Sequence, residues 1–335
     1  MAPQIRLYHI MAKVWVFTAA MLPFASAIAQ TPEYAPPSSP LWQGIFARPE
    51  TIRAPADNPL TNAKIMLGEQ LFFDKRLSGD GRRNCATCHM PEKGYSDGRT
   101  SSEGLNGKPL TRNTPALWNL AWAPHFYWDG RKPTLEDQAR VPIEHANEMG
   151  GDLAAASKVL NRDEKMEAVF AAAFPDSPYA SERTILAAIA SYERALISPV
   201  TRFDRWIDGE AGTLTMQEYR GFQLFTGRAG CLACHGGWRF TDDKFHDIGL
   251  STKDPGRSAV DGGPGRALRF KTPGLRGVQQ SAPYMHNGSM ASLEDVLSHY
   301  AGGFMRRPSL APTFVKNLKL SAQERAELIA FLKAL

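Results

Sequence analysis

Residues 85–89 read Cys-Ala-Thr-Cys-His, and residues 231–235 read Cys-Leu-Ala-Cys-His. These two stretches, the first and second haem box, contain all four cysteines of the 335-residue chain. Two closely spaced thiols followed directly by a histidine are the pattern of c-type haem attachment, where the thiols bind the haem vinyl groups and the histidine binds iron. The sequence therefore predicts two covalent haems, held by the following residues: Cys85, Cys88 and His89, and Cys231, Cys234 and His235.

Two other kinds of site use paired cysteines. One such pair could be a thioredoxin-like redox motif or half of a zinc site. Here both pairs carry the histidine, and the second box begins 146 positions after the first. Zinc sites join their cysteine pairs over short loops, so haem attachment is the interpretation that we adopt.

The charge and the N-terminus bear on partners and location. The formal net charge is +5, and no run of lysine or arginine exceeds two residues, which argues against a nucleic-acid surface. Arg6 and Lys13 precede an apolar stretch at 14–24, and Ala27-Ile28-Ala29 fits a cleavage site. Residues 1–29 are thus predicted to be a signal peptide and the protein to be periplasmic, without stable membrane insertion.

The remaining sequence predicts a mostly α fold of two cytochrome c-like haem domains with long loops. We expect an N-terminal arm at 30–60, a first domain at 61–200 and a second at 201–335. Leu67–Phe72 and Tyr219–Phe225 are both short amphipathic segments that end in Leu-Phe before a glycine-containing loop and a haem box. This similarity indicates an internal duplication. The helical patterns lie near 62–72, 152–174, 181–197, 216–225, 292–300 and 321–335.

The second axial position of each iron decides the function. A histidine, methionine or tyrosine there closes the iron for electron transfer, whereas an empty position lets peroxide bind. Composition alone does not choose among the candidates, which are His125, His145, His246, His286, His299, Tyr300, Met149, Met285, Met290 and Met305.

The chain resembles the bacterial di-haem cytochrome c peroxidase and MauG family from about Leu67 to Leu335. The shared motifs occur in order along the sequence: 71–74, 112–115, 128–131, Gln138, Pro142, Glu148-Met149, 230–236, 270–276 and 283–288. The resemblance implies two cytochrome c-like domains with Ca²⁺ between the haems. Its calcium ligands here would be the Asn113 side chain and the carbonyls of Ser281 and Pro283, oxygen donors that suit a hard cation.

The resemblance also implies roles in catalysis. Trp128 would lie between the two haems, and Gln138 and Glu148 would line the peroxide pocket of the first haem. Glu148 would move a proton between the peroxide oxygens.

Two positions depart from the ordinary peroxidases of this family, and a third departs from MauG. Leu105 stands where they carry a distal histidine, which predicts an open first haem. Tyr300, fourteen residues after His286, stands where they carry methionine on the second iron, and is similar to MauG. Ala229 stands where MauG has a surface tryptophan that passes oxidising equivalents to its protein substrate. Trp238, three residues after His235, is the candidate substitute.

Three functions remain open. The first is a MauG-like oxidase that uses H₂O₂ to oxidise a protein substrate, such as a quinone-cofactor dehydrogenase precursor. The second is a peroxidase that takes electrons from a small cytochrome or cupredoxin. The third, a non-catalytic di-haem electron carrier, is disfavoured by Leu105, Gln138 and Glu148. Tyr300 favours the first function over the second, and Ala229 weakens that preference.

Overall fold

The computed structural model describes residues 34–314 and 318–335, so the expected signal peptide lies outside the described residues. The described part is mostly helical, as predicted, and falls within one compact unit. Its α-helices are α1 (Pro40–Phe46), α2 (Asn62–Phe72), α3 (Leu135–Glu144), α4 (Leu153–Leu160), α5 (Glu164–Ala173), α6 (Glu182–Ala195), α7 (Arg202–Ile207), α8 (Met216–Thr226), α9 (Ser258–Asp261), α10 (Leu293–Ser298) and α11 (Ala322–Leu332). Strands β1 (Phe245–His246) and β2 (Phe270–Lys271) pair antiparallel.

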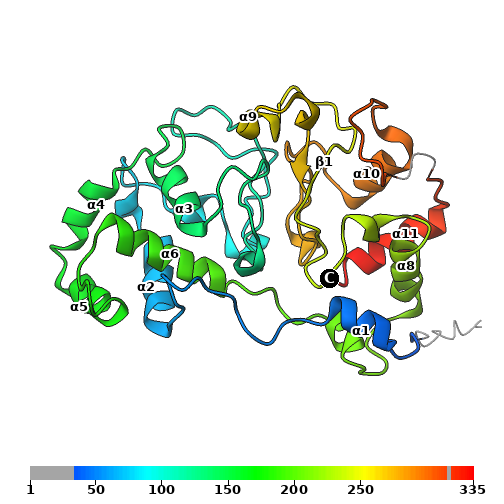
Figure 1. Ribbon diagram of the computed structural model, residues 1–335, viewed down its shortest axis with the longest axis horizontal. Helices are drawn as coiled ribbons and strands as arrows, with labels where there is room; N and C mark the ends of the chain where they lie inside the picture. The colour runs from blue at the N-terminus through cyan, green and yellow to red at the C-terminus, as the bar shows by residue number, and fades with distance from the viewer. Residues whose placement is uncertain (1–33, 315–317) are drawn as a thin grey trace, which may run out of the picture. The chain divides into compact units, whose positions relative to one another are not determined.

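Two equivalent helix crossings organise the fold. Helix α2 crosses α6, and α8 crosses α11 (Figure 1). A Cβ on Gly68 of α2 would overlap the backbone carbonyl of Ala188, and a Cβ on Gly221 of α8 would overlap that of Glu327. Glycine therefore permits the close approach at the same place in each pair. These crossings agree with the internal duplication that the sequence indicates.

Separate apolar clusters surround the two crossings. One cluster runs from Leu67 to Ile189 and includes Leu71 and Phe170. Another contains buried residues from Phe203 to Leu335 and is rich in aromatic rings. Apart from Ala35 and Phe46 of the N-terminal arm, which belong to the second cluster, the two clusters lie on either side of residue 200. We expect the domain boundary there, and that boundary stays a prediction.

The N-terminal arm contains a helix that the sequence analysis did not predict. Helix α1 begins with Pro40 in its first turn, and its last residue, Phe46, is fully buried. The Phe46 ring lies 5.6 Å from that of Phe203 and 5.0 Å from that of Phe240, measured between centroids. The arm therefore packs against the cluster that surrounds the second haem box (Figure 1).

The ends of the helices follow local sequence signals. Ser292 and Ser321 cap α10 and α11, each with an acidic residue three positions later that completes a capping box, as the sequence suggested. The helical pattern at 152–174 divides into α4 and α5, because Asp163 caps a new helix through its side chain. Among the described residues, no helix combines the length and the apolar character needed to cross a bilayer.

Candidate active site

The two haem boxes have the same local geometry. Each begins with a single 3₁₀ turn, η2 (Cys85–Thr87) or η5 (Cys231–Ala233). The His89 backbone N–H donates to the Cys85 carbonyl at 2.9 Å, and the His235 N–H donates to the Cys231 carbonyl at 2.8 Å. The four thiols form no disulfide. Each box therefore holds both thiols and its histidine as a unit ready to bind one group.

Each box histidine presents the same nitrogen for a metal. His89 Nδ1 lies 2.9 Å from the Tyr95 carbonyl oxygen, and His235 Nδ1 lies 2.8 Å from that of Phe240. A proton on Nδ1 leaves Nε2 as the free ligand atom, which is the usual arrangement of an iron-binding histidine. Burial lowers the pKa of both imidazoles and favours the neutral form that binds metals.

A single cavity of about 1390 Å³ is lined by residues of both boxes. Ligand pockets usually measure about 300–1,000 Å³, so this volume suits two large groups rather than one. The wall is largely apolar and includes Ile189, Leu275 and Leu328. Free thiols, free imidazole nitrogens and an apolar wall together fit two covalently attached haems.

Glu148 and Gln138 both line this cavity on the side of the first box. The Glu148 side chain is 27% exposed, and burial raises the pKa of its carboxyl above the ordinary value despite the opposing effects of His145 and Arg131. Gln138 Nε2 donates to the Tyr127 hydroxyl at 3.4 Å. Both of the predicted peroxide-pocket residues therefore face the cavity.

His145 is a neighbour of Glu148 whose place the sequence analysis did not predict. Its Nδ1 lies 3.7 Å from the Glu148 carboxylate, and the Asn147 N–H donates to the same nitrogen at 3.3 Å. Leu105 lies beside this turn, because its N–H donates to the Asn147 carbonyl at 2.9 Å. Leu105 is not among the described residues that line the cavity.

The duplication extends to the loops that face the boxes. Residues 126–132 and 284–290 form matching turns, closed by Phe126–Lys132 and Tyr284–Met290 bridges. Each turn has a residue with φ near 70° at its second position and a glycine with positive φ at its fifth. Each leads into a helix that lines the cavity, α3 capped by Thr134 and α10 capped by Ser292.

This duplication aligns Pro142 with Tyr300. Pro142 is the eighth residue after the cap of α3, and Tyr300 is the eighth after the cap of α10. Both line the cavity. A proline side chain has no atom that can bind iron, whereas a phenol oxygen can. The equivalent wall position therefore offers a ligand beside the second box and none beside the first.

Tyr300 lies in a π-helical turn, η8 (His299–Gly303), that continues α10. Its ring packs 5.4 Å from that of Phe314, and its hydroxyl makes no hydrogen bond within the described part of the chain. Of its two rivals, His299 uses Nε2 to contact the Ile248 carbonyl at 2.9 Å, and Met305 is 51% exposed. Neither rival is among the described residues lining the cavity.

Trp128 lines the cavity and is held by the first half of the chain. Its indole Nε1 donates to the Asn113 carbonyl at 2.9 Å, and its own carbonyl accepts from the Lys271 N–H at 2.8 Å. The equivalent turn residue in the second half, His286, stacks on Phe270 with centroids 3.6 Å apart. The Trp128 indole is thus held by the first half of the chain, and its backbone carbonyl contacts the second half.

The three predicted calcium ligands also line the cavity. The Asn113 side-chain amide donates to the Arg99 carbonyl at 2.8 Å, which leaves the side-chain oxygen available. The carbonyls of Ser281 and Pro283 accept no hydrogen bond from any described residue. Three oxygens without donors fit a hard cation such as Ca²⁺.

Ala229 and Trp238 are the two positions at which the sequence suggested a role, lost or retained, in electron exchange with a partner. Ala229 is buried in the aromatic cluster, at 6% exposure, so this position does not reach the surface. Trp238 is partly exposed, and its ring meets that of Trp122 edge-on, with centroids 4.8 Å apart. Arg48 lies over the Trp238 ring.

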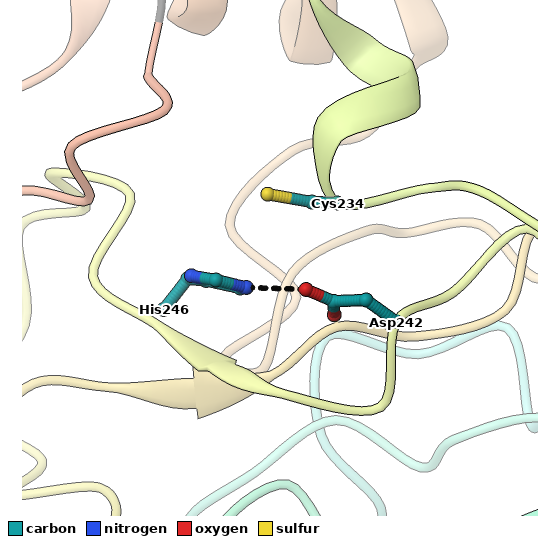
Figure 2. Close-up of side chains that lie close together, drawn as sticks. All are labelled: Cys234, Asp242 and His246. Atoms are coloured by element: carbon teal, nitrogen blue, oxygen red, sulfur yellow. Dashed lines mark hydrogen bonds and ion pairs between the residues drawn. The ribbon is translucent and has the colours of Figure 1, made fainter.

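A further cluster adjoins the second box. Cys234, Asp242 and His246 bring their ligand atoms within 4.8 Å of one another (Figure 2). Asp242 and His246 form an ion pair at 2.8 Å. In the haem-bound protein the Cys234 sulfur would be a thioether, so we interpret the cluster as an ion pair beside the haem. The sequence analysis considered His246 only as an axial ligand and did not single out Asp242.

Comparison with known proteins connects these boxes to one family. The model of the di-haem cytochrome c peroxidases matches residues 62–212, and a model described as RoxA-like, cytochrome c-like matches 269–301. The chain is 45% identical over 293 residues to the methylamine utilization protein MauG of Methylorubrum extorquens, covering 87% of this chain and 83% of that protein. The chain belongs to the di-haem cytochrome c peroxidase family. It is therefore an oxidoreductase, and the family implies haem c as its cofactor.

Other members of the family agree with this assignment. The cytochrome-c peroxidase IdrP1 of Denitromonas iodatirespirans is 34% identical, with 95% of this chain and 90% of that protein covered. The crystal structure of a MauG-like protein associated with microbial copper homeostasis matches with a TM-score of 0.79 and 34% identity, over 92% of this chain and 95% of that one. Because the relatives include both a MauG and a peroxidase, similarity alone does not identify the source of electrons.

Proposed function

We propose that this protein is a MauG-like periplasmic oxidase, which reduces H₂O₂ at the first haem and takes the electrons from a protein substrate. The observation that carries the proposal is the alignment of Pro142 with Tyr300 in the duplicated cavity wall. It supports an open first iron and a second iron closed by an oxygen ligand. The location rests on the predicted signal peptide, and the two haem domains at 61–200 and 201–335 belong to the same proposal.

The haems, held by the two boxes, would supply the redox equivalents and the iron to which peroxide binds. Glu148 accepts a proton from one peroxide oxygen and returns it to the other, so that the leaving oxygen departs as water. Gln138 orients the peroxide beside it. Pro142 fills the wall without blocking the iron.

Trp128 provides an oxidisable ring between the two boxes, and its hydrogen bond to Asn113 keeps that ring in place. Ca²⁺ held by Asn113, Ser281 and Pro283 would fix the same segment from the other side. Tyr300, as a phenolate, would favour the oxidised form of the second iron, because an anionic ligand stabilises higher positive charge.

A second candidate function is peroxide reduction with a small cytochrome or cupredoxin as electron donor. It is favoured by Ala229, which is buried and lacks an oxidisable ring. Trp238, with its partly exposed ring, favours the first function if it replaces the missing tryptophan. A non-catalytic electron carrier is disfavoured, because Pro142 leaves the first iron without a ligand on this wall.

The ferric spectrum of the haem-loaded protein tests the proposal. Electron paramagnetic resonance should reveal one high-spin and one low-spin haem in the protein as isolated. Tyr300→Phe should change the low-spin signal and leave the high-spin signal alone. Tyr284→Phe removes a hydroxyl from the same cavity wall and is the matched control. An identical low-spin signal in Tyr300→Phe would assign the ligand to another residue and favour the peroxidase function.

A further inference from the structure

The duplicated helix crossings also align α6 with α11. The Ala188 carbonyl faces Gly68 and the Glu327 carbonyl faces Gly221, so Ala188 and Glu327 are equivalent positions. One residue further along each helix, Ile189 corresponds to Leu328, and five residues further along, Glu193 corresponds to Leu332. All four residues line the cavity. The wall beside the second box thus presents leucine where the wall beside the first box presents a carboxyl group.

Glu193 is an unusual residue for such a wall. It is 5% exposed, and its Oε2 has no hydrogen-bond partner among the described residues. The adjacent Arg194 does not pair with it, because both terminal nitrogens of Arg194 donate to Glu136 at 2.8 Å. A buried polar atom without a partner is costly, so a role for Glu193 has to be sought in the cavity that it faces.

Burial raises the pKa of the Glu193 carboxyl to about 8, against an opposing effect of Arg194 and with a reinforcing effect of Glu136. The carboxyl is therefore largely protonated at neutral pH. Two other ionisable groups, Cys85 and Tyr127, are affected by Glu193. A negative charge on the Glu193 carboxylate would raise the pKa of both. A neutral acid thus faces the cavity within electrostatic range of Cys85 in the first haem box and of Tyr127, the hydrogen-bond partner of Gln138.

We propose that Glu193 is the internal proton donor of the first haem site, an inference that rests on the proposed function. Reduction of H₂O₂ breaks the O–O bond and consumes two electrons and two protons to form two waters. The electrons come from the haems and finally from the protein substrate. The first water carries both protons of the peroxide, one of them moved by Glu148, so the two further protons go to the oxygen that remains. Glu193 supplies one of these two protons as the substrate electrons arrive, becomes a carboxylate and is later protonated again from solvent.

The position of Glu193 complements that of Glu148. The Glu148 side chain is 27% exposed and can exchange protons with water, whereas Glu193 is only 5% exposed. A negative charge on either carboxyl raises the pKa of Tyr127, after the larger effect of burial, and the Tyr127 hydroxyl accepts a hydrogen bond from Gln138. Both acids therefore act on the same side chain, one in contact with water and one shielded from it.

Infrared difference spectroscopy of the haem-loaded protein tests this role directly. Addition of H₂O₂ together with a chemical reductant such as ascorbate should give a negative band in the carbonyl-stretch region of protonated carboxyl groups, shifted in D₂O and absent in Glu193→Gln. Glu327→Gln is the matched control, because Glu327 is equally buried at 5% but is ion-paired to Arg220 at 2.7 Å. The control should keep the band.

Stopped-flow mixing with H₂O₂ provides the second readout. Glu193→Gln and Glu193→Leu should keep both haems and slow peroxide consumption in turnover with the same reductant by about 10²-fold, the lower end of the effect of a positioned acid or base. A band that persists in Glu193→Gln, an unchanged rate in Glu193→Leu, or loss of the first haem would overturn the inference while the wild-type reaction stands. A wild-type protein that does not react with H₂O₂ would instead refute the proposed function, and this inference with it.

Discussion

Glu148→Gln is the most direct test of proton transfer in the first site. The substitution keeps the size of the side chain and removes its ability to accept a proton. Loss of a general acid–base group slows a reaction by roughly 10²–10⁴-fold. At about 1.36 kcal/mol for each factor of ten, this adds about 2.7–5.4 kcal/mol to the barrier. Because the Glu148 side chain is 27% exposed, water can partly replace it, and we expect the lower half of that range.

The same substitution should change the pH dependence. Glu148 must be ionised to accept a proton, and burial raises the pKa of its carboxyl. The rate of the wild-type protein should therefore fall as the pH drops through this raised pKa, and the Glu148→Gln rate should not. Stopped-flow absorbance of the haems after mixing with H₂O₂ measures both effects. Glu144→Gln, at a 41% exposed position paired with Arg140, is the control. An unchanged rate and pH profile in Glu148→Gln would remove Glu148 from the mechanism.

Three other changes test neighbouring parts of the structure. Trp238→Phe should slow oxidation of the protein partner in single-turnover assays while peroxide still reacts at the wild-type rate; equal slowing of both would contradict a relay role. Asn113→Ala should lower the calcium content per chain, measured by elemental analysis, and an unchanged content would move the site elsewhere. Gly221→Ala should cost about 1–3 kcal/mol of unfolding free energy in denaturant titrations, because the new Cβ overlaps the Glu327 carbonyl. Gly44→Ala, with open space around it, is its control and should not destabilise the protein.

Much of the fold follows from local signals. The haem boxes are recognised by spacing alone, and the caps Ser292 and Ser321 announce helices that the structure contains. Helix α1 was missed because seven residues are too few to show a period, and its stability comes from the burial of Phe46 among distant aromatic rings.

The candidate site was predictable only where its residues belong to sequence motifs. Tyr300 and Glu148 stand at recognisable positions of family motifs, and both do line the cavity. Glu193 carries no such signal, because a charged residue near the end of an alanine-rich helix is read as a solvated one. The burial of Glu193 becomes visible once α6 is packed against α2 in the folded chain. The correspondence of Pro142 with Tyr300 likewise depends on the structure, because it is counted from the N-caps of α3 and α10.

The two halves of the chain share a scaffold, so their different chemistry has to arise from side chains at equivalent positions. On the proposed function, Tyr300 would offer an oxygen ligand to the second haem, and Pro142 would offer none to the first. Leu332 cannot hold a proton, and Glu193 can. Both differences favour peroxide cleavage at the first site. A site that cleaves peroxide needs a free iron position and a nearby acid. A site that stores an oxidising equivalent needs a fixed ligand and a wall without proton donors. A reciprocal exchange, Pro142→Tyr with Glu193→Leu, should therefore close the first site, and its ferric spectrum should lose the high-spin signal. Persistence of that signal would mean that backbone differences, rather than these side chains, keep the first iron open.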